Sequence, residues 1–518
     1  MGSPKRLRLW LPACAAIITI AAAGCSASGP SGASGSGSGG GSDSVTIALQ
    51  VEPDSLDSCD TQTIKNGIIT HGNVVQALTA LQPTTKAVEP LLATSWTQQN
   101  PTTWIFKLRQ NVKFSDGTPF NAAAAAFGIM RTQNPKLSCL NEEEFATPVT
   151  ATAVNSYTLK VVTKEPDPVL PLRMSYIDLP SPKTPENAKA IAIGTGPYEI
   201  TGWDHGQDVT LKRFSGYWGA KPQVTGAQYI FRTDPEVRAD TAKTGEADIA
   251  IPTDPQDSTG NAQTENYTTS AVFFLRTETD RPPFNDVRVR QAVADAIDKN
   301  TIVSKLMTGF ATPTSQMVVS SNNGYIPGYT GPSYDLAKAK SLIAAAKAAG
   351  VDTSKQVLLI YRSDLFPGAD EVLQNIAADL NAAGLNIKVD AVDDTLWLKF
   401  LTKPFPASQQ VDILATLHDN ASGDAIFTFP KYITSSGTVS STSDPKVDSL
   451  VSQASAAEGS KRASLFQQAA LQLYTQDANI IPVAEVDNQL ILAKGVTYKT
   501  NGLTSVELLL SDIHLSSS

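Results

Sequence analysis

The chain has 518 residues, which is too many for one hydrophobic core, so we expect two or three packed units. Its composition, 41% hydrophobic, 18% charged and 7% aromatic, is that of an ordinary globular protein. Its 41 basic and 50 acidic residues give a net charge of -9. A surface of that sign repels phosphate backbones, so we expect no nucleic-acid partner.

The first 24 residues have the pattern of an export signal. Lys5, Arg6 and Arg8 precede an apolar run that is short for a membrane-spanning helix. The run ends in the letters AAGC, and small residues before a cysteine resemble the lipobox of bacterial lipoprotein signals. We therefore predict a lipoprotein signal peptide at 1–24, with Cys25 as the lipid-modified N-terminus. A plain secretory signal or an uncleaved anchor is the alternative.

Residues 25–43 are mostly glycine and serine, so we predict a flexible tether that holds the remaining chain near a membrane. Of the four cysteines, Cys14 leaves with the signal and Cys25 is the predicted lipid site. The other two are Cys59 and Cys139. In an oxidising compartment this pair is expected to form a disulfide, and two separate buried thiols are the alternative.

Alternation of apolar and polar residues predicts mainly strands up to residue 275. Strands are predicted at 45–50, 93–98, 104–108, 158–163 and 226–231, and helices at 73–81, at 122–131 after the cap Asn121, and at 237–244. A central stretch, GTGPYEITGWDHGQDVTLKRFSGYWG at 194–219, predicts a hairpin of strands 198–203 and 209–214. The apolar run 270–275 is expected to cross to a second lobe.

The second half alternates helices and strands. An apolar stripe at Val289, Ala292, Val293, Ala296 and Ile297 predicts a buried helix, with Asn285 as its cap. Helices are further predicted at 336–349, 370–383, 395–401, 446–457 and 461–478, and strands at 357–361, 387–392, 412–417, 480–484 and 489–493. This order indicates β-α-β units and a parallel sheet, and the last strands are expected to return to the first lobe.

Several long blocks of sequence are similar to one known family. They are GTGPYEITGW with VTLKRFSGYWGAKP, GEADIA at 245–250, PPFNDVRVRQAVADAID at 282–298, and the ordered segments LATSW, WIFKLR and VKFSDGTPF between 92 and 120. The chain resembles the extracytoplasmic solute-binding proteins of family 5, the peptide and nickel receptors of ABC importers.

The resemblance implies an α/β fold of the periplasmic-binding-protein type II (cluster C), with two α/β lobes joined by a hinge. Lobe I is then discontinuous, over 44–81, 191–275 and 480–518, with an extra subdomain at 82–190; lobe II is 276–479. Two or more strands must pass between the lobes, and such a pair would form the hinge.

The sequence offers few signs of catalysis. The four histidines stand far apart, without the spacing of H-E-x-x-H or C-x-x-C metal sites. A P-loop and a nucleophile motif are also missing from the sequence, so ATP hydrolysis would belong to a partner chain. We therefore expect a binding protein rather than an enzyme, with no cofactor and no metal.

A bound peptide needs a carboxylate for its ammonium end and an arginine for its carboxylate end. Relatives carry such an aspartate in a G-D-x-x-D-P context, and the matching place here is LHDNASGDA at 417–425. Asp419 is the candidate for the amine and Asp424 the alternative, while an Asx-turn is the structural interpretation of either. Arg362 matches the region of a carboxylate-binding arginine, and a surface arginine is its alternative.

Tyr361 and Trp397 could pack against a ligand or belong to the core. The favoured function is an extracytoplasmic receptor for short peptides that delivers them to an ABC permease with cytoplasmic ATPases. We expect a monomer held at the outer face of the cytoplasmic membrane by the lipid on Cys25. The alternatives are a receptor for nickel chelates, oligosaccharides or opine-like compounds, and an envelope regulator that acts by protein contact.

Overall fold

The computed structural model describes residues 43–61, 64–82, 85–187, 190–257, 263–406, 412–420, 422–500 and 507–516. The predicted signal peptide, Cys25 and the tether up to residue 42 lie outside these ranges. Within them, every helix is too short or too polar to cross a bilayer.

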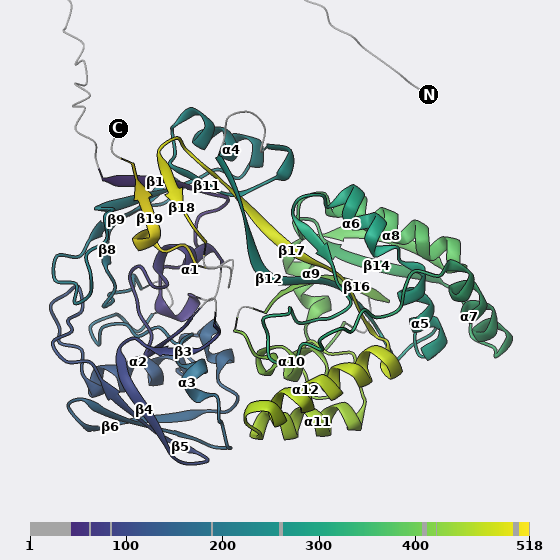
Figure 1. Cartoon of the computed structure of the whole chain (residues 1–518), viewed down its shortest axis with the longest axis horizontal. Helices are drawn as coiled ribbons and strands as arrows, with labels where there is room; N and C mark the ends of the chain where they lie inside the picture. The colour runs from purple at the N-terminus through teal and green to yellow at the C-terminus, as the bar shows by residue number, and fades with distance from the viewer. Residues whose placement is uncertain are drawn as a thin grey trace, which may run out of the picture. The chain divides into compact units, whose positions relative to one another are not determined.

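One large sheet extends through most of the described chain (Figure 1). Its strand order is β15-β14-β16-β12-β17-β11-β1-β10-β9-β8, and β13 pairs with β17 beside this path. The strands are β1 (Ser44–Leu49), β8 (Tyr198–Asp204), β9 (Asp208–Arg213), β10 (Gly226–Phe231), β11 (Ile249–Thr253), β12 (Gln263–Thr277), β13 (Ala311–Pro313), β14 (Gln356–Arg362), β15 (Asn386–Val392), β16 (Ile413–Asp419) and β17 (Ile480–Leu492).

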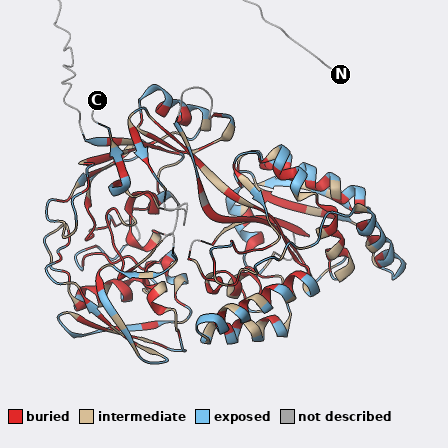
Figure 2. Cartoon of the chain, in the orientation of Figure 1, coloured by how far each residue is buried: buried red, intermediate tan, exposed pale blue. Residues whose placement is uncertain are grey.

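The antiparallel pair β12 and β17 belongs to both lobes. Gln263 pairs with Leu492 at the lobe I end, and Arg276 pairs with Ile480 at the lobe II end. The ladder is interrupted between residues 268 and 271, where Ser270 has a φ of 57°. Figure 2 shows buried residues along both strands. The predicted two-lobed α/β fold with paired crossing strands is confirmed.

The strand pairing shifts the border between the lobes relative to the predicted residue ranges. From Ala271 onward β12 pairs with the lobe II strand β16. Phe273 and Leu275, together with Ile481 and Val483 of β17, are buried in the core of lobe II. Residues 271–275 and 480–486 therefore pack with lobe II, although the sequence places them in lobe I, because the crossing strands enter its core before they end.

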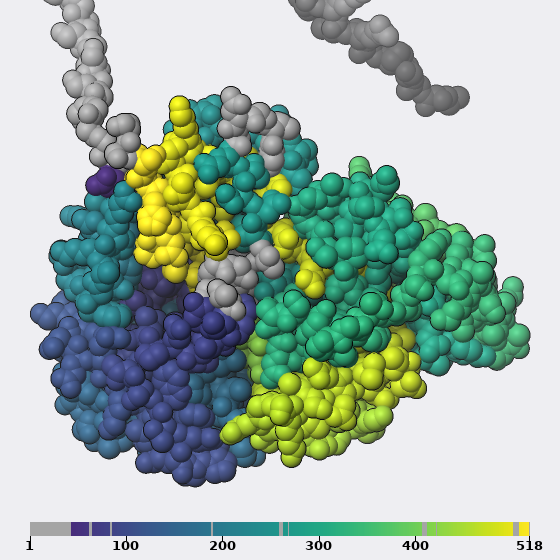
Figure 3. Space-filling view, viewed as in Figure 1, coloured from purple at the N-terminus to yellow at the C-terminus, as the bar shows by residue number. Residues whose placement is uncertain are grey.

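Lobe I packs its remaining elements around the other half of the sheet. These elements are α1 (Ile64–Thr70), α4 (Pro235–Thr244) and the two-stranded sheet of β18 (Val496–Tyr498) and β19 (Ile513–Leu515). In Figure 3 the yellow C-terminal residues lie against the purple and teal residues of lobe I. Two hydrogen bonds to Gln223 hold the end of β19 there, since its side chain pairs with the backbone of Leu515 at 2.9 and 3.4 Å.

The predicted helix at 73–81 is wrong. The helix lies earlier, in α1, and a short strand β2 (Thr79–Leu81) pairs with β3 (Val88–Pro90). The carbonyl of Asn73 accepts from the amide of Tyr198, and that of Val74 accepts from Gly196, each at 2.9 Å. Backbone groups that a helix would need are therefore bonded to the central stretch instead.

The extra subdomain has its own sheet and core. Its strands lie in the order β4 (Ala93–Asn100), β5 (Thr103–Leu108), β7 (Thr158–Thr163) and β6 (Val149–Asn155), and its helices are α2 (Ala122–Thr132) and α3 (Leu170–Arg173). Asn121 caps α2 as predicted, because its side chain accepts from the amide of Ala124 at 3.0 Å.

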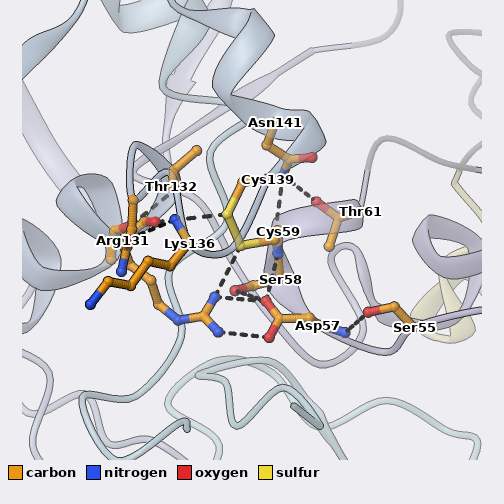
Figure 4. Close-up of a disulfide and its surroundings, with 12 residues drawn as sticks. Ser55, Asp57, Ser58, Cys59, Thr61, Arg131, Thr132, Lys136, Cys139 and Asn141 are labelled. Carbon is orange, nitrogen blue, oxygen red and sulfur yellow. Dashed lines mark hydrogen bonds and ion pairs between the residues drawn. A yellow bond between two sulfur atoms is a disulfide. The ribbon is translucent and has the colours of Figure 1, made fainter. Parts of the chain in front are cut away.

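A disulfide between Cys59 and Cys139 attaches the subdomain to lobe I (Figure 4). The cysteines lie in the turns η1 (Ser58–Asp60) and η2 (Leu140–Glu144) or directly beside them. Arg131 of α2 reinforces the junction, since both of its terminal nitrogens donate to Asp57 at 2.7 Å. Both members of this ion pair are buried, so each neutralises a charge that has lost its water.

Helices cover both faces of the sheet in lobe II. One core contains α5 (Val287–Ala296), α6 (Lys299–Leu306), α7 (Leu336–Ala348) and α8 (Ala369–Ala383), and the other contains α9 (Asp394–Leu401), α10 (Phe429–Tyr432), α11 (Pro445–Ala456) and α12 (Gly459–Gln472). The apolar stripe of α5 is buried as predicted. Its cap is Asp286, however, whose side chain accepts from the amide of Arg288 at 2.9 Å, and not Asn285.

The central stretch at 194–219 begins with a backbone contact that tolerates only glycine. A Cβ added to Gly194 would lie 1.8 Å from the carbonyl oxygen of Val74, and one added to Gly196 would lie 2.4 Å from that of Asn73. Both obstacles are backbone atoms, which cannot rotate away. The GTGP motif is therefore required for the chain at 194–197 to lie directly against residues 73–75.

We expect Gly194→Ala to destabilise the protein by at least about 1–3 kcal/mol, the usual cost of overpacking, because the new methyl group must displace backbone. The matched control is Gly206→Ala in the β8–β9 turn, where the added Cβ meets nothing within 4 Å and only the positive φ opposes it. Chemical denaturation of both variants measures the difference. Equal, small losses would contradict the close contact.

Candidate functional site

Lobe I contains a cavity of about 410 Å³, which is the size of a site for a small solute. Its lining comes from segments that are distant in the sequence, 71–91, 175–178, 197–222 and 507–512. The central stretch forms part of the wall through Pro197 and Tyr217.

Gln76 joins the wall of the cavity to the central stretch. Its Oε1 accepts hydrogen bonds from the hydroxyl of Thr195 at 3.1 Å and from the indole of Trp218 at 3.0 Å. Its Nε2 donates to the hydroxyl of Tyr217 at 3.3 Å. The guanidinium of Arg109 stacks over Trp218, 4.3 Å from the ring centroid. These contacts fix the side of the cavity formed by the GTGP segment and the aromatic pair.

A charged cluster lies at the other side of the cavity. The Nδ1 of His71 is 2.7 Å from the Oδ2 of Asp178, and its Nε2 is 3.7 Å from the Oε2 of Glu507. Burial opposes the imidazolium and lowers the pKa of His71, but the two carboxylates outweigh it and raise this pKa from 6.5 to about 9. His71 is therefore protonated at neutral pH.

Tyr176 connects this cluster with lobe II. Burial raises the pKa of its hydroxyl well above the usual value, and the negative charges of Glu144, Asp419 and Glu507 raise it further. Asp419 belongs to lobe II, at the end of β16, whereas Glu507 lines the cavity in lobe I. Tyr176 thus lies near carboxylates of both lobes.

Side chains of the two lobes are in direct contact around this point. The rings of Tyr176 and Phe427 have centroids 5.8 Å apart, and the guanidinium of Arg173 lies 4.9 Å from the same Phe427 ring. The Nζ of Lys431 pairs with the Oε2 of Glu143 at 2.6 Å. An exposed ion pair contributes little to stability, so the contacts of the aromatic ring are the larger part of this junction.

Of the residues predicted to bind a ligand, Asp419 faces lobe I. Burial lowers the pKa of Lys86, and the charge of Asp419 partly opposes this shift. Lys86 also lies 3.7 Å from the position of a Cβ on Gly423. Asp424 has a different environment. It is buried and accepts hydrogen bonds from two guanidinium nitrogens of Arg462, Nε at 2.9 Å and Nη2 at 3.0 Å. Its side chain also caps the turn η4 (Ala425–Phe427).

The other three predicted residues lie apart from the described lining of the cavity. Arg362 pairs with Asp364 at 2.7 Å and with Asp394 at 3.1 Å. The hydroxyl of Tyr361 donates to Asp370, and its ring lies in the core under α8. The indole of Trp397 donates to the carbonyl of Ala415 at 3.1 Å, in the core of the opposite face. These positions favour the surface and core alternatives.

Comparison with known proteins places the chain in a family. The profile of the bacterial extracellular solute-binding proteins, family 5 (middle region), matches residues 87–455. The chain belongs to this family. The resemblance seen in the sequence is thereby confirmed, and the members of the family are receptors for solutes outside the cytoplasm.

The chain is also similar to a curated protein in sequence and to solved structures in fold. The glutathione-binding protein GsiB of Escherichia coli is 29% identical over 316 residues, 58% of this chain and 61% of GsiB. A structure of the ABC transporter substrate-binding protein CtaP from Listeria monocytogenes matches with a TM-score of 0.80 and 18% identity, over 92% of this chain and 99% of CtaP. DppA from Helicobacter pylori, in complex with the peptide STSA, matches with a TM-score of 0.77 and 20% identity, over 92% and 98%. At these identities the two structures establish the fold alone.

Sequence reasoning missed the residues that line the cavity of this solute-binding protein. His71 and Asp178 are 107 positions apart, and Glu507 is far from both. A local motif does not mark any of them. The glycines of the GTGP stretch are a usable signal in the sequence, because they indicate that another segment packs closely against this backbone. They do not identify 73–76 as that segment.

The cluster at His71 predicts a specific pH dependence of stability. Because the folded-state pKa is above the ordinary value, the stabilisation is fully present below about pH 6.5 and is lost as the pH rises through about 9. Its size is on the order of 3 kcal/mol. Unfolding free energies between pH 6 and 10 should show this component in full in the wild type, reduced in Asp178→Asn, where Glu507 remains, and absent in His71→Gln. An equal slope in all three proteins would contradict the cluster.

Proposed function

We propose that this chain is the extracytoplasmic receptor of an ABC importer, which captures short peptides between its lobes and delivers them to a membrane permease. Cytoplasmic ATPases of the importer supply the energy, and the receptor itself breaks no bonds. The observation that carries this proposal is the cavity in lobe I, whose lining residue Tyr176 contacts the ring of Phe427 in lobe II. A solute held there lies against a residue at the contact between the lobes, which couples its binding to closure.

The relatives support a peptide as the solute. GsiB is named for glutathione, a tripeptide, and DppA was solved with a tetrapeptide. We propose that Asp419 pairs with the terminal ammonium group, because this charge loses water on closure and needs a buried partner. Arg362 is a weaker candidate for the carboxylate end, since two aspartates already pair with it.

We further propose that the mature protein starts at a lipid-modified Cys25 and is held at the outer face of the cytoplasmic membrane. Residues 25–43 would then act as a flexible tether between the lipid and lobe I. This arrangement keeps the receptor close to its permease without a spanning helix.

Native mass spectrometry of gently purified protein tests the receptor function. We expect a complex with a small solute, and release followed by fragmentation should identify a short peptide. Failure of the purified protein to retain or bind any peptide from a dipeptide-to-pentapeptide library would contradict the proposal.

Substitution of the two aspartates separates binding from stability. Asp419→Asn should weaken peptide binding by about 2 kcal/mol or more, since it leaves a buried ammonium without its partner, with little change in the thermal midpoint. Asp424→Asn should instead lower the thermal midpoint, because Arg462 then remains buried without a full counter-charge. Isothermal titration and thermal unfolding measure the two effects. Unchanged affinity in Asp419→Asn would remove its assigned role.

A further inference from the structure

The cavity in lobe I has a strongly one-sided charge. Among the described residues that line it, Glu89, Asp178, Glu507 and Asp512 are acidic, His71 is basic, and lysine and arginine do not occur. Even with His71 protonated, negative charges are in excess. A solute that enters this cavity and loses water is therefore favoured if it brings positive charge.

Asp178 shows that the lining has acceptor capacity to spare. Its side chain is fully buried, and its Oδ2 is engaged by His71. Its Oδ1 has no hydrogen-bond partner within the part of the chain that the structure describes. A buried carboxylate oxygen without a donor is costly, and a donor on a bound solute would remove that cost.

Two tyrosines also line the cavity, and a cation that reaches a ring face is attracted to it. They are Tyr176 and Tyr217, and their ring faces are negative. Lys86 is outside the lining and interacts with Asp419 instead, so its charge offsets that carboxylate rather than the cluster at Asp178.

We propose that this receptor selects short peptides that carry a basic side chain, with the ammonium or guanidinium group held in the cavity by Asp178 and Glu507. The inference rests on the proposed peptide-receptor function and adds a charge preference to it. It also separates this chain from its glutathione-binding relative, because glutathione has two carboxylates and one ammonium group and so carries net negative charge.

Titration calorimetry of the mature protein, freed of bound solute, tests this preference. The probes are Ala-Lys-Ala, Ala-Gln-Ala, Ala-Glu-Ala and glutathione. We expect the lysine peptide to bind at least about tenfold more tightly than the glutamate peptide and glutathione, with the glutamine peptide between them.

Glu507→Gln should reduce the ratio of the affinities for the lysine and glutamate peptides by about tenfold. Asp178→Asn should reduce this ratio as well, but it also breaks the pair with His71. If Asp178→Asn does not fold, Glu507→Gln alone tests the preference. The matched control is Glu236→Gln, which removes the same charge from the exposed side of α4 and should leave the preference unchanged.

Each outcome has a distinct meaning. Equal binding of the three tripeptides would overturn the charge preference and leave the peptide receptor intact. If none of them binds, the peptide receptor is contradicted, and L-arginine and spermidine become the probes. Binding of either one would then support a cationic solute, and failure of both would overturn the inference as well.

Discussion

Because β12 and β17 pair along nearly their whole length, the two lobes share one hydrogen-bonded sheet and cannot separate without breaking it. The ladder is interrupted only near residues 268–271 and again beside Phe273, so bending is easiest where the pair leaves lobe I. At this point Asn420 donates to the carbonyl of Ser270, which ties the end of β16 to the bend. Movement at the bend therefore carries Asp419 toward or away from lobe I.

The second constraint is electrostatic. Asp178 is buried beside the cavity in lobe I. Its negative charge is stabilised by the protonated His71, and the charge of Glu507 helps to keep the imidazole protonated. The cluster leaves negative charge in excess where a solute would lie. Fold and selectivity are thus coupled, because the His71, Asp178 and Glu507 side chains both hold the C-terminal segment in lobe I and set the charge of the cavity.

Local patterns were sufficient for much of the fold. The cap at Asn121, the buried stripe of α5 and the hairpin β8–β9 depend on contacts within a few residues, and the structure has all three. The helix expected at 73–81 failed for the opposite reason. Asn73 bonds to the backbone of Leu508 and Leu510, more than 400 positions away, and the backbone around it serves the GTGP segment.

The site was less accessible to sequence reasoning. Arg362 and Trp397 follow strands or lie on a helix in the expected order, but order does not fix which way a side chain points. Arg362 pairs with two aspartates at the surface, and the indole of Trp397 donates to a carbonyl in the core. The cavity residues come from four distant segments, and only the assembled lobe brings them together.

We propose that the two lobes close around a small solute by bending at the β12–β17 pair. Small-angle X-ray scattering of the mature protein, first freed of solute and then saturated with the solute that co-purifies with it, tests this most directly. We expect a smaller radius of gyration in the saturated protein. An unchanged radius of gyration at saturation, with binding verified in the same sample, would contradict it.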